Sequence, residues 1–301
     1  QLHEDWAKDG PNLRTLDLQK VEWEYCSKLL TEEQRQVFSA VLGHLRRLGW
    51  SVLSGPGGSG KTRMLRFLCE ALQASTVAST SAGPDCPRCG HPRLVTRCEL
   101  CGHMRENNEL RPPRLAFLAP TNRAVAVLQR ALGSLSAYVC YGTVHSVARR
   151  TDLPTQDLIV VDEASMMASE HADLLLQCDA FADAAWLLVG DHLQLPPMGD
   201  GELLRPLLLR SGLPALRTNM RARCPQLAEL IQAVRSGNPR GITARTQHCS
   251  SVRELLDTVS AAKCDLVLCV RNEERVRYNA HEIQRRPCSN QRLAALDDYR
   301  R

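Results

Sequence analysis

The sequence is poor in aromatic residues and in lysine, and it contains no long apolar run. Aromatic side chains make up 4% of the 301 residues, and only five of the 38 basic residues are lysine, at positions 8, 20, 28, 61 and 263. No uninterrupted apolar run approaches the roughly 18 residues of a membrane span, and the amino end does not resemble a secretory signal. We therefore expect an intracellular protein, nuclear or cytoplasmic, that has no membrane partner.

The overall composition is that of an ordinary globular protein. Apolar residues account for 44% and charged residues for 24%, and the length admits one large or two ordinary domains. The formal charge of +5 is mild, so attraction to an acidic partner would be local and not global. Thirteen cysteines without a secretory signal indicate reduced thiols, because disulfides persist mainly in oxidising compartments.

The most informative segment is a glycine-rich turn that matches G-x-x-x-x-G-K-[ST] in full. An apolar, strand-like run from Trp50 precedes it, and residues 63–72 are patterned as a helix, which is the context that a phosphate-binding loop requires. The glycines allow backbone N–H groups to point at phosphate oxygens, and the helix N-terminus adds partial positive charge. Lys61 would reach the β- and γ-phosphates, and the Thr62 hydroxyl would hold Mg²⁺. The predicted nucleoside triphosphate site comprises Gly55, Gly57, Gly58, Ser59, Gly60, Lys61 and Thr62.

Two later apolar runs end in polar side chains suited to hydrolysis. The run 158–161 leads into Asp162 and Glu163, where Asp162 would hold Mg²⁺ and Glu163 would polarise the attacking water. About a hundred residues after a phosphate loop, this acidic pair is strong evidence for a nucleotide hydrolase. The run 185–190 is followed by Gln194, which can bond both the γ-phosphate and the attacking water.

Four cysteines form a separate case. Cys86 with Cys89 and Cys98 with Cys101 repeat the unit C-x-x-C-G-H, which can place four thiolates around Zn²⁺. Haem attachment needs C-x-x-C-H without the extra glycine, and a thioredoxin-like pair would open a helix. We predict a structural zinc site within an insertion over residues 82–110, with both following histidines outside the ligand set.

Taken in order, these motifs resemble those of superfamily-one DNA helicases of the RecD-like, 5′→3′ group. The herpesvirus helicase–primase helicase subunit shares much of the pattern. The matching segments are residues 30–34, 55–62, 119–124, 143–145, 162–165, 190–197 and 216–221.

The resemblance implies further roles for individual residues. Gln34 matches the residue that reads the adenine edge of ATP, and Arg221 matches an arginine that the second domain extends to the γ-phosphate. Residues in two turns match those that contact single-stranded DNA, namely Thr121, Asn122, Arg123, Thr143 and His145. No base-stacking residue stands out; Tyr138 and Tyr141 are candidates, but core packing is favoured for both.

The predicted architecture is an α/β fold with two RecA-like lobes. We expect an N-terminal segment over 1–29, an ATP-binding lobe over 30–212 and a partial second lobe over 213–301. The family's two late motifs have no counterpart, which indicates either part of a longer polypeptide or a truncated relative, and predicts poor unwinding by these residues alone.

The expected activity is ATP-dependent DNA unwinding, with ATP, Mg²⁺ and Zn²⁺ as cofactors and with replication or repair proteins as partners. The alternatives are an RNA helicase of a related viral type and a non-catalytic nucleotide-binding assembly subunit.

Overall fold

Five short apolar strands form one parallel sheet in the computed structural model. The strands are β1 (Trp50–Ser54), β2 (Leu115–Ala119), β3 (Val139–Thr143), β4 (Leu158–Val161) and β5 (Ala185–Gly190). They are ordered β1-β5-β4-β2-β3, and every neighbouring pair is parallel. The predicted α/β fold with a parallel sheet is confirmed, and the runs predicted as strands before the phosphate loop, before Asp162 and before Gln194 are strands.

The structure describes residues 30–70, 113–133, 139–197, 199–222, 224–238 and 271–285, together with 249, 251, 254–255 and 257–258. The segment 1–29, the four cysteines of the predicted zinc site, Tyr138 and the apolar run 265–270 lie outside these residues. The zinc-binding insertion therefore stays a prediction. No helix in the described part of the chain is long and apolar enough to cross a membrane.

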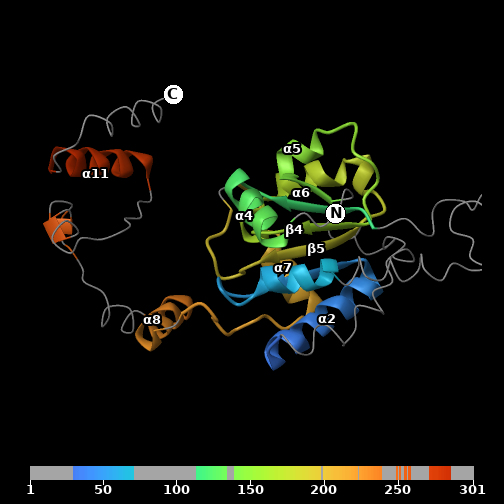
Figure 1. The fold of residues 1–301 in the computed structure, drawn as a ribbon, viewed down its shortest axis with the longest axis horizontal. Helices are drawn as coiled ribbons and strands as arrows, with labels where there is room; N and C mark the ends of the chain where they lie inside the picture. The colour runs from blue at the N-terminus through green and yellow to red at the C-terminus, as the bar shows by residue number, and fades with distance from the viewer. Residues whose placement is uncertain are drawn as a thin grey trace, which may run out of the picture. The chain divides into compact units, whose positions relative to one another are not determined.

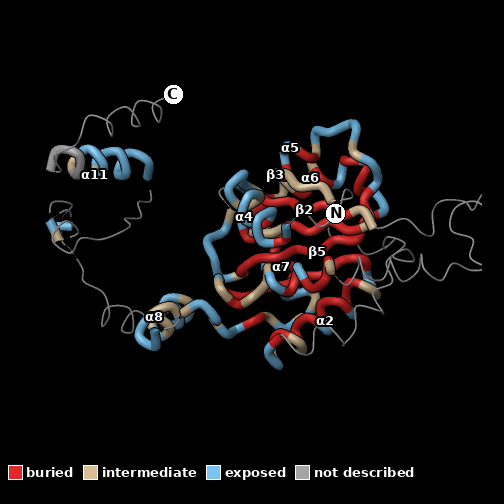
Figure 2. Tube along the Cα trace, in the orientation of Figure 1, coloured by how far each residue is buried: buried red, intermediate tan, exposed pale blue. Residues whose placement is uncertain are grey.

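Helices cover both faces of the sheet because side chains alternate along each strand. One face packs against α2 (Glu32–Leu48), the helical residues 61–70 and α4 (Asn122–Leu132). The other face packs against α5 (Val144–Ala148), α6 (Ser169–Leu176) and α7 (Leu204–Ser211), with the short turns η2 (Ala164–Met166) and η3 (Asp179–Phe181). Figure 1 shows these elements, and Figure 2 shows the buried residues running along the strands.

The helix α2 is delimited by clear sequence signals. Thr31 accepts the N–H of Gln34 at 3.3 Å, and the Gln34 side chain accepts the N–H of Thr31 at 3.0 Å, which completes a capping box. The helix ends at Gly49, whose φ of 73° is easy only for glycine and whose N–H donates to Leu45. These two caps fix where α2 starts and stops next to β1.

Tyr141 is partly buried and packs against the core, the role favoured for it from the sequence. Its ring stacks on Phe117 with 5.5 Å between the ring centroids, and its hydroxyl donates to the carbonyl of Gly133 at 3.3 Å. Burial raises the pKa of its hydroxyl to about 12. These contacts favour packing over base stacking as the role of Tyr141.

Contacts divide the chain into two units, residues 1–228 and residues 229–301. The predicted bounds of the two lobes, 30–212 and 213–301, stay predictions. Two further helices are α8 (Pro225–Arg235) and α11 (Asn272–Arg285). The second RecA-like lobe itself stays a prediction.

Candidate nucleotide and nucleic-acid site

The phosphate motif, the acidic pair, Gln194 and the residues predicted to contact DNA lie at or just after the carboxyl ends of strands, whereas Gln34 lies in α2 and Arg221 follows α7. Because the five strands are parallel, those ends lie along one edge of the sheet. The phosphate motif follows β1, the Gln194 turn follows β5 and the acidic pair follows β4, in that spatial order. Because β5 lies between β1 and β4, the turn with Gln194 lies between the phosphate loop and the acidic pair.

The phosphate loop has the backbone conformation and the polar groups of an anion cradle. Gly58 and Gly60 have φ values of 80° and 93°, which side chains other than glycine rarely adopt. The Ser59 hydroxyl oxygen is buried without a hydrogen-bond partner among the described residues. The Lys61 ammonium donates to the carbonyls of Gly55 at 2.7 Å and Pro56 at 3.0 Å. A buried Ser59 hydroxyl without a hydrogen-bond partner and a Lys61 ammonium bonded to carbonyls of the loop both fit a site that binds phosphate oxygens.

The Gln34 side chain packs against this loop. Its side chain is 5% exposed, and Nε2 donates to the Ser59 carbonyl at 2.8 Å. A Cβ on Gly60 would lie 2.4 Å from the same Nε2, so only glycine fits there. The structure thus brings Gln34 to the nucleotide site, while its role in reading the adenine edge stays a prediction.

The acidic pair lies at the end of β4, beside the phosphate loop. Desolvation and the neighbouring Glu163 raise the pKa of Asp162 to about 6, although the Glu163 N–H and the Lys61 cation act in the opposite direction. The Glu163 N–H donates to Oδ1 of Asp162 at 2.9 Å. Carboxylate, hydroxyl and ammonium groups together suit Mg²⁺ and phosphate, and Asp162 with Thr62 would hold the metal.

Glu163 has an unusual backbone conformation. Its φ of 53° and ψ of 37° are left-handed, and no other non-glycine residue in the described part of the chain has a positive φ. Such a conformation costs on the order of 1 kcal/mol and is concentrated at functional sites. This conformation is independent of the sequence motif and agrees with the catalytic role predicted for Glu163, which stays a prediction.

Gln194 lies within reach of the turn that follows Glu163. The Ser165 hydroxyl donates to Oε1 of Gln194 at 3.3 Å. Gly190 makes this approach feasible, because a Cβ there would lie 3.1 Å from the Ser165 nitrogen and 3.2 Å from the Ala164 nitrogen. The structure thus joins Gln194 to the acidic turn.

The segment 216–221 packs directly on the phosphate loop. The N–H of Leu216 donates to the Ser54 carbonyl at 2.8 Å, and that of Met220 donates to the Gly58 carbonyl at 2.9 Å. A Cβ on Gly58 would lie 2.6 Å from Cβ of Arg221. Arg221 therefore lies beside the phosphate loop, while its assignment to a second lobe and its role at the γ-phosphate stay predictions.

Glu33 anchors the same segment to α2. Its carboxylate accepts the N–H of Arg217 at 2.6 Å. Burial alone would raise the pKa of Glu33, but hydrogen bonds from Thr218 and from the Arg217 backbone outweigh it and lower the pKa. The first turn of α2 thereby contacts the segment that carries Arg221.

The residues predicted to contact DNA lie on the other half of the same edge, after β2 and β3. Thr121 and Thr143 are N-caps, accepting N–H groups of α4 and α5 at 3.2 Å each. Asn122, Arg123 and His145 are exposed. Nucleotide-site and strand-contacting candidates therefore occupy adjacent halves of one sheet edge.

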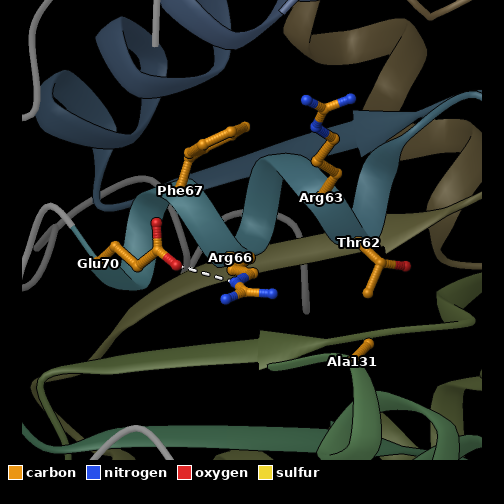
Figure 3. Close-up of a pocket in the computed structure, with 6 residues that line it drawn as sticks. All are labelled: Thr62, Arg63, Arg66, Phe67, Glu70 and Ala131. Atoms are coloured by element: carbon orange, nitrogen blue, oxygen red, sulfur yellow. Dashed lines mark hydrogen bonds and ion pairs between the residues drawn. The ribbon is translucent and has the colours of Figure 1, made fainter. Parts of the chain in front are cut away.

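A cavity of about 490 Å³ lies along the helical residues that follow the loop (Figure 3). The described residues that line it are Thr62, Arg63, Arg66, Phe67, Glu70 and Ala131. Arg66 pairs with Glu70 at 2.8 Å, and the Arg63 guanidinium lies 5.8 Å from the Phe67 ring centre. Because the lining carboxylate is already paired, the cavity adds no obvious general base to the site.

Three polar residues of the site escaped prediction: Ser54, Ser165 and His192. Each makes a hydrogen bond across strands that are far apart in the chain. Ser165 and His192 belong to the matching segments 162–165 and 190–197, and this membership was the only feature of the sequence that could have indicated them.

The comparisons identify a family for most of the chain. A family model described as an AAA domain matches residues 29–256. Among solved structures, Pif1 from Bacteroides bound to single-stranded DNA is 17% identical, with 77% of this chain and 49% of that chain covered and a TM-score of 0.40. The Pif1 helicase from Candida albicans is 16% identical, with 80% of this chain and 56% of that chain covered and a TM-score of 0.44.

An arterivirus nonstructural protein 10 helicase with DNA is 14% identical, with 60% and 39% of the two chains covered and a TM-score of 0.29. The chain thus spans about half the length, or less, of these structures. The RecD-like and herpesvirus resemblance stays a prediction.

Proposed function

Because the chain belongs to the AAA domain family, we propose that it is an ATP-hydrolysing motor that acts on single-stranded DNA as part of a helicase. The observation that carries the proposal is the Asp162–Glu163 pair beside Lys61, with Glu163 held in a left-handed backbone conformation. A site that only binds nucleotide has no need of such a strained carboxylate.

The roles of the residues follow from their positions at the sheet edge. The loop N–H groups and Lys61 bind the β- and γ-phosphates, while Thr62 and Asp162 would hold Mg²⁺, which neutralises phosphate charge when bound. Glu163 takes a proton from the attacking water, and Gln194 orients that water against the γ-phosphate. Arg221 stabilises charge that develops on the transferred group.

Coupling to DNA is supported by the shared sheet edge. Residues after β2 and β3 would bind the DNA backbone, and residues after β1, β5 and β4 would bind the nucleotide, so a shift of one group is transmitted through a single sheet. Movement in the 5′→3′ direction and assembly with replication or repair proteins extend the proposal on the strength of the motif resemblance.

The test is the rate of ATP hydrolysis with and without single-stranded DNA, with Lys61→Ala as control. We expect DNA to stimulate hydrolysis by about tenfold, which is within what correct positioning of catalytic groups contributes, and we expect the variant to lose this activity. Stronger stimulation by RNA would favour an RNA helicase. Nucleotide binding without Lys61-dependent hydrolysis would favour an assembly subunit.

Two substitutions at Thr121 distinguish its helix-capping role from its predicted role in contacting DNA. Thr121→Ala removes the cap of α4 and is expected to lower the unfolding free energy by about 1 kcal/mol. Thr121→Asp keeps a capping oxygen but adds a negative charge, which we expect to weaken DNA binding about fivefold, because a unit charge about 4 Å from a phosphate contributes about 1 kcal/mol in water.

Thermal unfolding and fluorescence anisotropy on labelled single-stranded DNA measure the two effects. Equal DNA affinity of Thr121→Asp and the unchanged chain would remove residue 121 from the DNA interface.

A further inference from the structure

A pair of hydrogen bonds joins the end of β1 to the turn that follows β5. Ser54, the last residue of β1, is fully buried, and its hydroxyl oxygen lies 2.8 Å from Nδ1 of His192. The same oxygen accepts the backbone N–H of His192 at 3.3 Å. The two residues are 138 positions apart in sequence, so tertiary structure and not local preference brings them together.

The turn that carries His192 is compact. The N–H of Leu193 donates to the Asp191 carboxylate at 3.1 Å, and the N–H of Gln194 donates to the Asp191 carbonyl at 3.0 Å. Asp191 is itself only 2% exposed. Because both bonds close the turn onto a buried residue, a displacement of His192 also displaces Gln194.

The turn is held from two sides. On the β1 side, Ser54 contacts His192; on the β4 side, the Ser165 hydroxyl donates to Oε1 of Gln194 at 3.3 Å. The β1 contact adjoins the phosphate loop, since Gly55 follows Ser54 and its N–H donates to the Gly190 carbonyl at 3.1 Å. The Gly55 carbonyl accepts the Lys61 ammonium at 2.7 Å. One short path of contacts therefore runs from Lys61 to Gln194.

We propose that His192 is a positioning residue for ATP hydrolysis. Through the Ser54 hydroxyl it fixes the position of the turn 191–194 relative to the phosphate loop. Binding of a triphosphate in the loop therefore orients the Gln194 side chain toward the attacking water. The inference rests on the proposed function, because it assigns Gln194 to the attacking water. His192 itself contacts neither nucleotide nor water in this role.

Three variants separate this role from simple packing. His192→Phe keeps an aromatic ring but removes the Nδ1 partner of the Ser54 hydroxyl. His192→Asn retains a side-chain oxygen that can accept from that hydroxyl. His44→Phe is the matched control, because Nδ1 of His44 bonds the Trp50 carbonyl at 2.8 Å, at the opposite end of the same strand.

The kinetic test measures kcat and KM for ATP hydrolysis in the presence of single-stranded DNA. We expect His192→Phe to lower kcat about 10- to 100-fold with KM changed less than about twofold, as for a misplaced catalytic group. His192→Asn should stay within about threefold of the unchanged chain. Ser54→Ala and the double variant should lose no more than His192→Phe alone, because residues that act through one contact are not additive.

Hydrogen–deuterium exchange gives a readout that does not require turnover. Binding of a non-hydrolysable ATP analogue should slow exchange in the peptide containing Leu193 and Gln194 in the unchanged chain and in His44→Phe, but not in His192→Phe. Equal protection in all three chains, or an unchanged kcat in His192→Phe, would overturn the inference. If the unchanged chain showed no Lys61-dependent hydrolysis, but protection of the 193–194 peptide from exchange still required His192, the proposed function alone would be overturned.

Discussion

Glu163→Gln is expected to lower kcat for ATP hydrolysis by about 10³-fold while leaving nucleotide binding nearly unchanged. Glutamine has almost the same shape as glutamate but cannot accept a proton, and a positioned general base contributes about 10²- to 10⁴-fold. The Glu163 N–H would still donate to Asp162, so the turn is kept. Steady-state hydrolysis and the affinity for a fluorescent ATP analogue, measured on one preparation, check both halves of the expectation.

The matched control is Glu170→Gln, which removes an exposed carboxylate at the start of α6. It should leave kcat unchanged. If Glu163→Gln kept more than about a tenth of the activity, the proton would have another acceptor and the assignment of the base would be wrong.

Asp162→Asn is expected to stabilise the metal-free protein at pH 7.5 while abolishing metal-dependent hydrolysis. The folded-state pKa of Asp162, about 6, lies above the ordinary value of 3.8, so ionisation opposes folding at neutral pH. This pKa difference corresponds to at most about 3 kcal/mol, and solvent reduces it because the residue keeps partial exposure. The asparagine oxygen can still accept the Glu163 N–H.

The sign of the pH dependence follows from the raised pKa. As the pH falls through about 6 toward 4, Asp162 becomes protonated in the folded state first, and the unchanged chain recovers the lost stability. The advantage of Asp162→Asn should therefore shrink over this range and vanish near pH 3.8. Urea unfolding in EDTA at several pH values measures it, and an advantage that grows on acidification would contradict the assignment.

The sheet and its edge could be predicted from the sequence because the determining signals are local. A buried parallel strand is a short apolar run, and a phosphate loop is a contiguous motif, so β1, β4 and β5 were recognisable. The acidic pair was assigned to its strand end for the same reason.

Contacts between distant segments could not be predicted in this way. Nothing in the local pattern around Gly60 indicates that the Gln34 amide lies against it, or that Ser54 meets His192. The contact of Met220 with Gly58, which brings Arg221 next to the phosphate loop, has no local signal either. The left-handed backbone of Glu163 also has no signal in its own residue type, because the surrounding structure imposes it.

The pairing of Met220 with Gly58 and of Leu216 with Ser54 has a consequence for biosynthesis. A ribosome adds about 5–20 residues per second, so Met220 is made roughly 10–30 s after Gly58. β5, which pairs with β1, is also made late. During this interval the nascent chain carries a complete phosphate motif without its last backbone partners. The phosphate loop is thus among the last parts of the first unit to gain all its contacts, and a nascent chain released before Met220 is made would lack the Met220–Gly58 hydrogen bond.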